Sequence, residues 1–402
     1  MRISTQTFYE QSRTSMGSQQ SSLLRVQQQL GAGTKILAPS DDPLGATRAL
    51  AISQSISLTA QYSASRDHAV QTLSLEENAL QSVTSLLQNI KSSLIEAGNG
   101  TMTDADRATI ATTLQSNLDQ LQGLANTDDG NGQFLFAGFR SSSAPFVRQA
   151  GGSIEYNGDQ GQRQVQVDVS RQMAGTDDGR SIFMSVQSGA GYVASAPSTN
   201  TGSGVFSSTS VVNPNDVDYG KDFVISFPDA GSYQVTVPPS ATPLVAATPF
   251  TPGSAITFGG LQISISGTPA AGDQVNVATA RNAGSDVFAA IGDVINALRT
   301  PVDGPENQAL VLNALSTANR KLTNAHDNVL TVRASVGSRL QELDVLAVVA
   351  DNRTLFDKSY LSDLQDLDYS SAIAEFYQRQ TGLQASQQTF VKIQQLSLFN
   401  YL

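Results

Sequence analysis

The chain of 402 residues has few side chains that could carry chemistry. It contains no cysteine and only two histidines, His68 and His326, and neither has a cysteine or a second histidine nearby. A zinc site needs three or four such ligands. No Ser-His-Asp or Cys-His order, phosphate loop or dinucleotide motif is present. We therefore predict a structural or exposed role for both histidines, no catalytic residue, no metal site and no cofactor.

Two acidic segments are similar to metal sites at first sight. Asp41 and Asp42 could form a metal or acid/base pair, but no third ligand is in view. Ser40, Asp41 or Asp42 can instead cap the following helix, and Pro43 suits its first turn. Residues 126–132 are similar to a calcium loop, yet the bidentate glutamate that such a loop requires does not follow. We interpret the two segments as a helix cap and a turn.

Composition excludes several classes of function. The formal charge is -11 and the basic residues are scattered, which argues against a nucleic-acid surface, because such surfaces cluster Lys and Arg. No apolar run approaches the roughly 18 to 20 residues that span a bilayer, so no membrane segment is predicted. The first ten residues lack a hydrophobic stretch, which predicts that no secretory signal peptide is present. Apolar residues make up 40% of the chain, enough to bury a core.

Apolar residues recur every seven positions in two flanks, as in helices that pack along other helices. The first flank predicts a helix from about 44 to 97 that ends at the glycine-rich 98–100. Asp104 then opens a shorter antiparallel helix that stops at 126, and helical periodicity returns near Asp286. The seven-residue positions are Leu73, Leu80, Leu87 and Leu94, then Leu315, Leu322, Val329, Val336, Leu343 and Ala350.

Between the flanks the pattern changes to period two. Residues 163–169, 232–237 and 261–265 alternate apolar and polar side chains, and turn-forming residues separate them. Ten of the 14 prolines lie between Pro145 and Pro269, and proline is excluded from helix interiors. This middle stretch therefore predicts short antiparallel strands in a small sandwich or barrel-like sheet.

Together the segments predict an α+β fold, in which a long-helix bundle built from both halves of the sequence brackets an inserted antiparallel β-rich domain. Residues 1–43 are predicted to form an N-terminal assembly helix and a break. Residues 44–144 and 285–360 are predicted to form the two halves of a helical core. Residues 145–284 are predicted to form the β-rich domain, and 361–402 a C-terminal assembly helix. Both assembly helices are predicted to be disordered in the monomer.

At both ends of the chain, large apolar and aromatic residues recur every seven positions. Glutamine fills many of the positions beside them, which weakens packing in isolation and favours a partner that can bond each amide. The ends are predicted to pair with each other or with copies of themselves. An equally weighted alternative is two ordinary amphipathic helices of one core. The predicted interface residues are Tyr9, Met16, Leu23 and Leu30 at the first end, and Tyr369, Ile373, Phe376, Leu383 and Phe390 at the second.

Four motifs at the two ends of the chain resemble a known family. Lys35-Ile-Leu-Ala-Pro-Ser-Asp-Asp-Pro43 is similar to the segment after the first helix of flagellin-related proteins. Gly132-Gln-Phe-Leu-Phe-Ala-Gly138 before Pro145-Phe146, Arg333-Ala-Ser-Val-Gly-Ser-Arg-Leu340 and the ending Leu396-Ser-Leu-Phe-Asn-Tyr-Leu402 are similar to further phrases of that family. The Pro-Ser-Asp-Asp-Pro form and the ending most resemble the hook–filament junction proteins of bacterial flagella, the third of the hook-associated proteins.

The resemblance implies a structural, non-enzymatic protein of the bacterial flagellum. It implies unfolded export through the flagellar type III apparatus, an export chaperone on the C-terminal segment and an extracellular location. It further implies a ring of copies between the first hook-associated protein and the flagellin filament, with the terminal helices in inner coiled-coil tubes and the β domain outside.

Three alternatives remain at this point. Flagellin, the filament subunit, has the same kind of helices at its two ends. A secreted enzyme would need a nucleophile, base or metal cluster, and residues 145–280 contain no His or Cys. An adhesin whose β domain binds a host ligand stays open as a secondary role.

Overall fold

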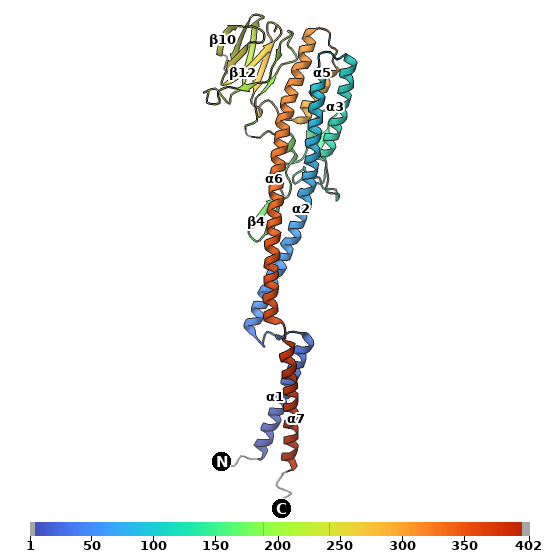
Figure 1. Cartoon of the computed structure of the whole chain (residues 1–402), viewed down its shortest axis with the longest axis vertical. Coiled ribbons are helices and arrows are strands. Elements are labelled where there is room, and N and C mark those ends of the chain that lie inside the picture. The colour runs from blue at the N-terminus through green and yellow to red at the C-terminus, as the bar shows by residue number, and fades with distance from the viewer. Residues whose placement is uncertain (1–4, 188, 241, 396–402) are drawn as a thin grey trace, which may run out of the picture. The chain divides into compact units, whose positions relative to one another are not determined.

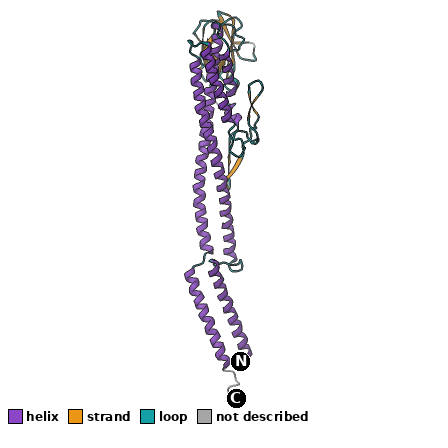
Figure 2. Cartoon of the chain, turned by 90° about the vertical axis from the view of Figure 1, so that its right-hand side faces the viewer, coloured by secondary structure: helices purple, strands orange, loops and turns teal. Residues whose placement is uncertain are grey.

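The computed structural model describes residues 5–187, 189–240 and 242–395. Helices form where the seven-residue pattern predicted them, and strands fill the proline-rich middle (Figures 1 and 2). The α+β fold class predicted from the sequence, long helices from both ends with an inserted antiparallel β region, is confirmed. The helices are α1 (Thr5–Ala32), α2 (Pro43–Ala97), α3 (Asp104–Ala125), α4 (Gly179–Phe183), α5 (Val287–Arg299), α6 (Pro305–Gln365) and α7 (Tyr369–Gln395).

The chain divides into two compact units. Unit 1 joins the chain up to Ala64 with the chain from Val345 onward, and unit 2 is Ser65–Asp344. The helices α2 and α6 each contribute one part to unit 1 and the other part to unit 2. Each unit is described by itself below.

The core of unit 2 follows the predicted seam. All four leucines of the α2 repeat, Leu73 to Leu94, are buried, as are the α6 positions from Leu315 to Leu343. The cap of α3 is a capping box: Thr103 accepts a hydrogen bond from the Asp106 amide, and the Asp106 carboxylate accepts one from the Thr103 amide. The periodicity near Asp286 belongs to a separate helix, α5, which packs against α3 (Figure 1).

A β-sandwich occupies the second half of the β region. One sheet has the strand order β10-β9-β8-β13-β5, and the other has β11-β12-β6, with β7 also paired to β12. Their inner faces share one buried cluster that includes Phe223, Ile225, Phe258 and Ile263. The strands are β5 (Val193–Ser195), β6 (Val205–Phe206), β7 (Ser210–Val211), β8 (Phe223–Asp229), β9 (Ser232–Thr236), β10 (Pro243–Pro249), β11 (Ala255–Phe258), β12 (Leu261–Ser266) and β13 (Gln274–Ala278).

The chain between α3 and the sandwich forms two separate hairpins. The first pairs β1 (Phe146–Arg148) with β2 (Ile154–Tyr156), and the second pairs β3 (Gln164–Asp168) with β4 (Arg171–Ala174). These hairpins share no sheet with the sandwich. Phe146 instead joins an aromatic cluster with Phe183 and with Phe288 of α5, at centroid distances of 5.4 and 5.0 Å. The first hairpin is therefore anchored to a helix.

A row of side chains on α6 holds the edges of the sandwich. Thr317 Oγ1 donates a hydrogen bond to the carbonyl of Ala194 at 2.9 Å, and Arg320 Nε donates to that of Tyr192 at 3.1 Å. An edge strand exposes unpaired backbone groups that otherwise invite further strands. The α6 residues that bond backbone groups at or directly before these strands are Asn313, Thr317, Arg320 and Asn324. Asn328, on the same helix face, donates instead to the carbonyls of Ser181 and Ile182 in α4.

Candidate assembly surfaces

In unit 1 the two terminal helices lie side by side (Figures 1 and 2). The rings of Tyr9 and Phe390 meet edge to face, with centroids 5.8 Å apart and planes at 87°. Ser386 Oγ donates a hydrogen bond to Gln19 Oε1 at 2.9 Å. In this last contact, a glutamine that lies beside the repeated apolar residues of α1 is hydrogen-bonded to a side chain of α7.

The residues predicted at this interface divide into two groups. Tyr369 and Ile373 are 53% and 44% exposed, so they lie outside the tight part of the helix pair. Two further α7 residues are covered: Ala372 is buried, and Ser386 is half-buried. The half-buried members of the prediction are Tyr9, Met16, Leu23, Leu30, Phe376, Leu383 and Phe390. Whether these side chains also contact other chains stays a prediction.

Sequence reasoning missed a second surface in unit 1. Five apolar side chains on the last part of α6 are 58 to 71% exposed: Val345, Val348, Val349, Leu355 and Phe356. Val348 and Val349 follow Val345 by three and four positions, and Leu355 and Phe356 follow them by seven, so the five side chains share one helix face. On α2, Leu44, Leu50 and Leu58 are 48 to 62% exposed. We call these eight residues the apolar stripe. The spacing is present in the sequence, but the stronger inward repeat from Leu315 to Leu343 on the same helix indicates only its other face.

The connections α1–α2 and α6–α7 are hydrogen-bonded to each other. The Lys35 amide donates to the Gln365 carbonyl at 2.8 Å, and the Leu367 amide donates to the Gly33 carbonyl at 3.0 Å. Lys35 Nζ donates to the carbonyl of Asp363 at 2.6 Å. Gly33 has φ +71, a conformation that glycine adopts without steric cost.

Asp41 and Asp42 both act as backbone acceptors. Asp42 Oδ1 accepts the Gly45 amide at 2.9 Å at the start of α2, as an N-cap does. Asp41 Oδ2 accepts the amides of Leu37 and Ala38, both at 3.1 Å, and its other oxygen lies 2.8 Å from Arg25. The acidic pair thus shapes the break before α2, as the capping interpretation predicted.

The 126–132 segment is a turn closed by its own carboxylate. Asp129 Oδ1 accepts the amides of Asn131 and Gln133, at 2.9 and 3.1 Å. These hydrogen bonds hold the pKa of Asp129 below its usual range. Within the described residues, no group of three or more His, Asp or Glu side chains is placed to hold a metal ion.

The motif Gly132–Gly138 buries a close backbone crossing. Gly138 has φ +67, and a Cβ built there would lie 2.5 Å from the carbonyl oxygen of Asp159. Tyr156 Oη donates to the carbonyls of Phe136 and Asp159, at 3.0 and 2.7 Å. Burial raises the pKa of Tyr156 to about 12, so the phenol stays a hydrogen-bond donor. The motif is structural.

Both arginines of the Arg333–Leu340 motif form hydrogen bonds and ion pairs with residues outside α6. Arg333 pairs with Glu77 of α2 through two nitrogens, at 3.0 and 2.6 Å from Oε1. Arg339 forms an ion pair with Asp177 and donates to the carbonyl of Ala174 at 3.1 Å. The motif therefore ties α6 to α2 and to the second hairpin.

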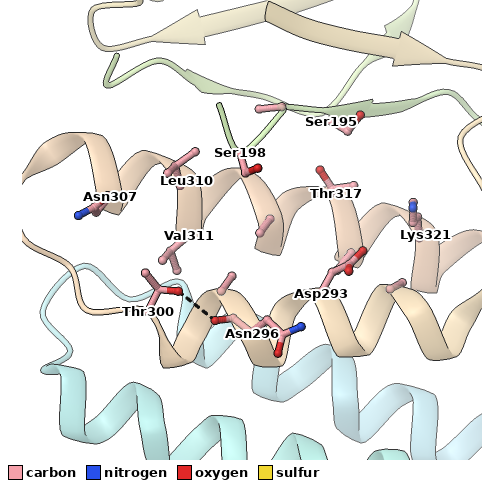
Figure 3. Close-up of a pocket in the computed structure, with 15 residues that line it drawn as sticks. Ser195, Ser198, Asp293, Asn296, Thr300, Asn307, Leu310, Val311, Thr317 and Lys321 are labelled. Atoms are coloured by element: carbon pink, nitrogen blue, oxygen red, sulfur yellow. Dashed lines mark hydrogen bonds between the residues drawn. The ribbon is translucent and has the colours of Figure 1, made fainter. Parts of the chain in front are cut away.

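A cavity of about 510 Å³ lies between α5, α6 and the residues that follow β5 (Figure 3). Figure 3 shows Asn307 toward one end and Lys321 toward the other, with Asp293 and Thr317 between them. The side chains that line it include no histidine and no cysteine, so it offers no nucleophile–base pair of the Ser-His or Cys-His kind.

Comparison with known proteins identifies the family of the chain. Residues 3–141 match the bacterial flagellin N-terminal helical region. Flagellar hook-associated protein 3 of Salmonella typhimurium (strain LT2) is 32% identical over 400 residues, which cover 99% of each chain. The chain belongs to the flagellar hook-associated protein 3 family. Members of this family are structural flagellar proteins and not enzymes, so the enzyme alternative is excluded.

Solved structures of the family agree with the fold. FlgL of Xanthomonas campestris matches with a TM-score of 0.69 at 29% identity, over 77% of this chain and 99% of that chain. The flagellar junction protein FlgL of Legionella pneumophila matches with a TM-score of 0.65 at 28% identity, over 79% and 99%. Family membership places the protein in the flagellum. Over the part of the chain that the structure describes, no helix is both long and apolar enough to span a bilayer.

Proposed function

We propose that this hook-associated protein 3 family member is a building block of the junction between hook and filament. In this role, copies assemble as a ring and contact the first hook-associated protein on one side and flagellin on the other. The observation that carries the proposal is the apolar stripe of unit 1. Its five α6 side chains share one helix face and are all exposed, and exposed apolar surfaces of this kind mark protein–protein contacts.

The pair of terminal helices supports the same role. Its seam combines aromatic contacts with small and amide side chains, as Tyr9–Phe390 and Gln19–Ser386 show. Such a seam is weaker than a leucine-filled one, which suits helices that must also repack against other chains. The predicted interface residues Tyr369 and Ile373 are exposed and free for that purpose.

The route to the junction is part of the proposal. The chain leaves the cell through the flagellar type III apparatus, an export chaperone holds the C-terminal segment, and the assembled protein is extracellular. The absence of cysteine fits a chain that passes unfolded through a narrow channel, because no disulfide has to be reduced.

Deletion of the gene tests the proposed role. Electron microscopy should show hooks without filaments, with flagellin shed into the medium, and the wild-type gene should restore filaments. Complementation with a Phe356→Asp variant should fail, although the culture medium still contains the exported variant protein. Normal filaments on the deletion strain would refute a junction role.

Stoichiometry separates the junction role from that of flagellin. A junction ring requires few copies per flagellum, whereas a filament requires thousands. Quantification of this chain against the other axial proteins in sheared flagella should find it as a minor component. A dominant band would favour the filament role instead.

A further inference from the structure

The second hairpin of unit 2 lies against both long helices. We call residues 164–178, which comprise β3, β4 and the following loop, the strap. Arg66 Nη1 of α2 donates to the carbonyl of Val167 at 2.9 Å. From α6, Glu342 accepts two hydrogen bonds from Arg171 at 2.6 and 2.8 Å. Figure 1 shows β4 beside α6. The strap therefore connects two helices that are distant in the sequence.

The end of the strap meets a buried carboxyl group. Glu76 of α2 is 0% exposed, and its Oε1 accepts the amide of Asp177 at 3.3 Å. The other oxygen, Oε2, is buried and has no hydrogen-bond partner among the described residues. A charged carboxylate left in this state would be strongly unfavourable, whereas a neutral carboxyl group is tolerated.

The surroundings of Glu76 favour the neutral form. Burial, together with the nearby Asp177 carboxylate, raises its pKa to about 8, against the opposing influence of Arg339. Arg339 is itself engaged by Asp177 and by the carbonyl of Ala174. The next carboxylate of α2, Glu77, is paired with Arg333.

We propose that Glu76 is a proton-controlled latch for the strap: protonated Glu76 holds the strap on α2 and α6, and its ionisation releases the strap. In the released state Glu76 reaches water, and its proton leaves to solvent. The ion pair Arg339–Asp177 then loses its neighbouring backbone contact, because the Asp177 amide no longer bonds Glu76. The strap thereby becomes a movable link between the two long helices.

The pH window follows from the two environments of Glu76. A solvated glutamate has the ordinary pKa of 4.5, and the closed strap raises this value to about 8. Below 4.5 both states are neutral and the latch is fully closed. Between the two values the open state binds fewer protons, so opening becomes about tenfold more favourable per pH unit. Above about 8 both states are charged and opening no longer changes with pH.

A histidine also lies beside the strap. His68 of α2 lines a small cavity together with Gly175 and Thr176 of the strap, and with Asp129 and Arg163. Histidine side chains as a class change charge between pH 5 and 8. A test must therefore distinguish Glu76 from His68.

Hydrogen exchange of the full chain provides the test. Protection of the strap amides, corrected for intrinsic exchange, should fall about tenfold per pH unit from about pH 5.5 to 7.5 and level off above about 8. Glu76→Gln keeps the shape and the acceptor but cannot ionise, so its profile should be flat. His68→Gln should keep the wild-type slope, and the β8–β9 hairpin of the same molecule should show no such slope.

Three outcomes would overturn the latch. A slope that persists in Glu76→Gln, or one that disappears in His68→Gln, would assign the effect to another group. If Glu76→Gln fails to fold, the wild-type profile still decides, because equal protection of the strap at about pH 5.5 and 7.5 contradicts the proposal.

Discussion

The side chain of Asn313 on α6 makes hydrogen bonds with the backbone at Phe206 of β6, as a neighbouring strand would. Its Oδ1 accepts the Phe206 amide at 3.1 Å, and its Nδ2 donates to the carbonyl of Gly204 at 2.8 Å. Asn313 is buried, so no water can replace these two bonds when the side chain is removed. The β-sandwich is thus fixed to the helix through its backbone.

Asn313→Ala should therefore loosen the sandwich. The change leaves a buried donor and a buried acceptor unsatisfied, at a cost of about 1–3 kcal/mol for such groups. Chemical denaturation would show the loss of stability, and hydrogen exchange would place it at β6. The control is Asn296→Ala on α5, an exposed position, where a change of less than about 0.5 kcal/mol is expected. Equal effects of the two variants would contradict the role of Asn313.

Two glycines of one motif form a matched pair. Both have positive φ, +80 at Gly132 and +67 at Gly138, but a Cβ at Gly132 would meet nothing within 4 Å. Alanine should cost roughly 1–2 kcal/mol at either position for the left-handed backbone. At Gly138 the clash with the Asp159 carbonyl should add about 1–3 kcal/mol. Thermal melting of the two variants measures the difference, and equal melting temperatures would argue against a tight crossing.

The half-buried Leu383 permits a test of the terminal helix pair. Leu383→Asp places a charge in the seam between α1 and α7 and should destabilise that pair by about 1–3 kcal/mol. The main melting transition, which reports unit 2, should stay unchanged. Limited proteolysis of α1 and α7 is the measurement, with Tyr377→Asp, on a 62% exposed residue, as the control. A large shift of the main transition would place Leu383 in the principal core instead.

The apolar stripe should matter for association and not for folding. Phe356 is 71% exposed, so Phe356→Asp should change the stability of the monomer by less than about 0.5 kcal/mol. Its self-association at high protein concentration, followed by sedimentation velocity, should be suppressed. Val217→Asp, on an 88% exposed residue of unit 2, controls for the added charge. Equal association of both variants would remove the stripe from the interface.

Stability should fall with rising pH through the burial of Glu76. Because its folded pKa of about 8 exceeds the ordinary 4.5, the stability that neutral Glu76 contributes is complete below 4.5. It is lost between 4.5 and about 8, at about 1.4 kcal/mol per pH unit, and does not change further above that. Urea denaturation of wild type and Glu76→Gln across this range measures the effect as their difference. A constant difference would contradict a buried neutral carboxyl group.

The sequence periodicity predicted the long helices, because their buried apolar residues recur at regular intervals. The repeats Leu73–Leu94 and Leu315–Leu343 are apolar and strictly spaced, so the seam of unit 2 was predictable residue by residue. Glu76 lies between Leu73 and Leu80, on the same side of the helix as these two leucines. It broke the apolar pattern, and the pattern alone could not show that the carboxyl group is buried.

Long-range backbone contacts were beyond such reasoning. Asn313 and Asn324 are polar residues on a helix, and only the arrival of distant strand edges gives them a partner. For the same reason the first two hairpins could not be separated from the sandwich, because alternation shows which residues face inward but not what they face. On α7, the choice between Ala372 and Ile373 as the inner position depends on a rotation of one residue.

The paired connections near Gly33 and Leu367 have a mechanical consequence. Each is a break between helices, and a single unpaired linker at such a point bends and twists freely. Here the Lys35–Gln365 and Leu367–Gly33 hydrogen bonds cross-link the two breaks. A torque applied to α7 is therefore shared between two backbones in parallel, whose cross-links are sheared together. When one of these bonds breaks the others remain, so we expect the joint to bend and twist less than a single linker.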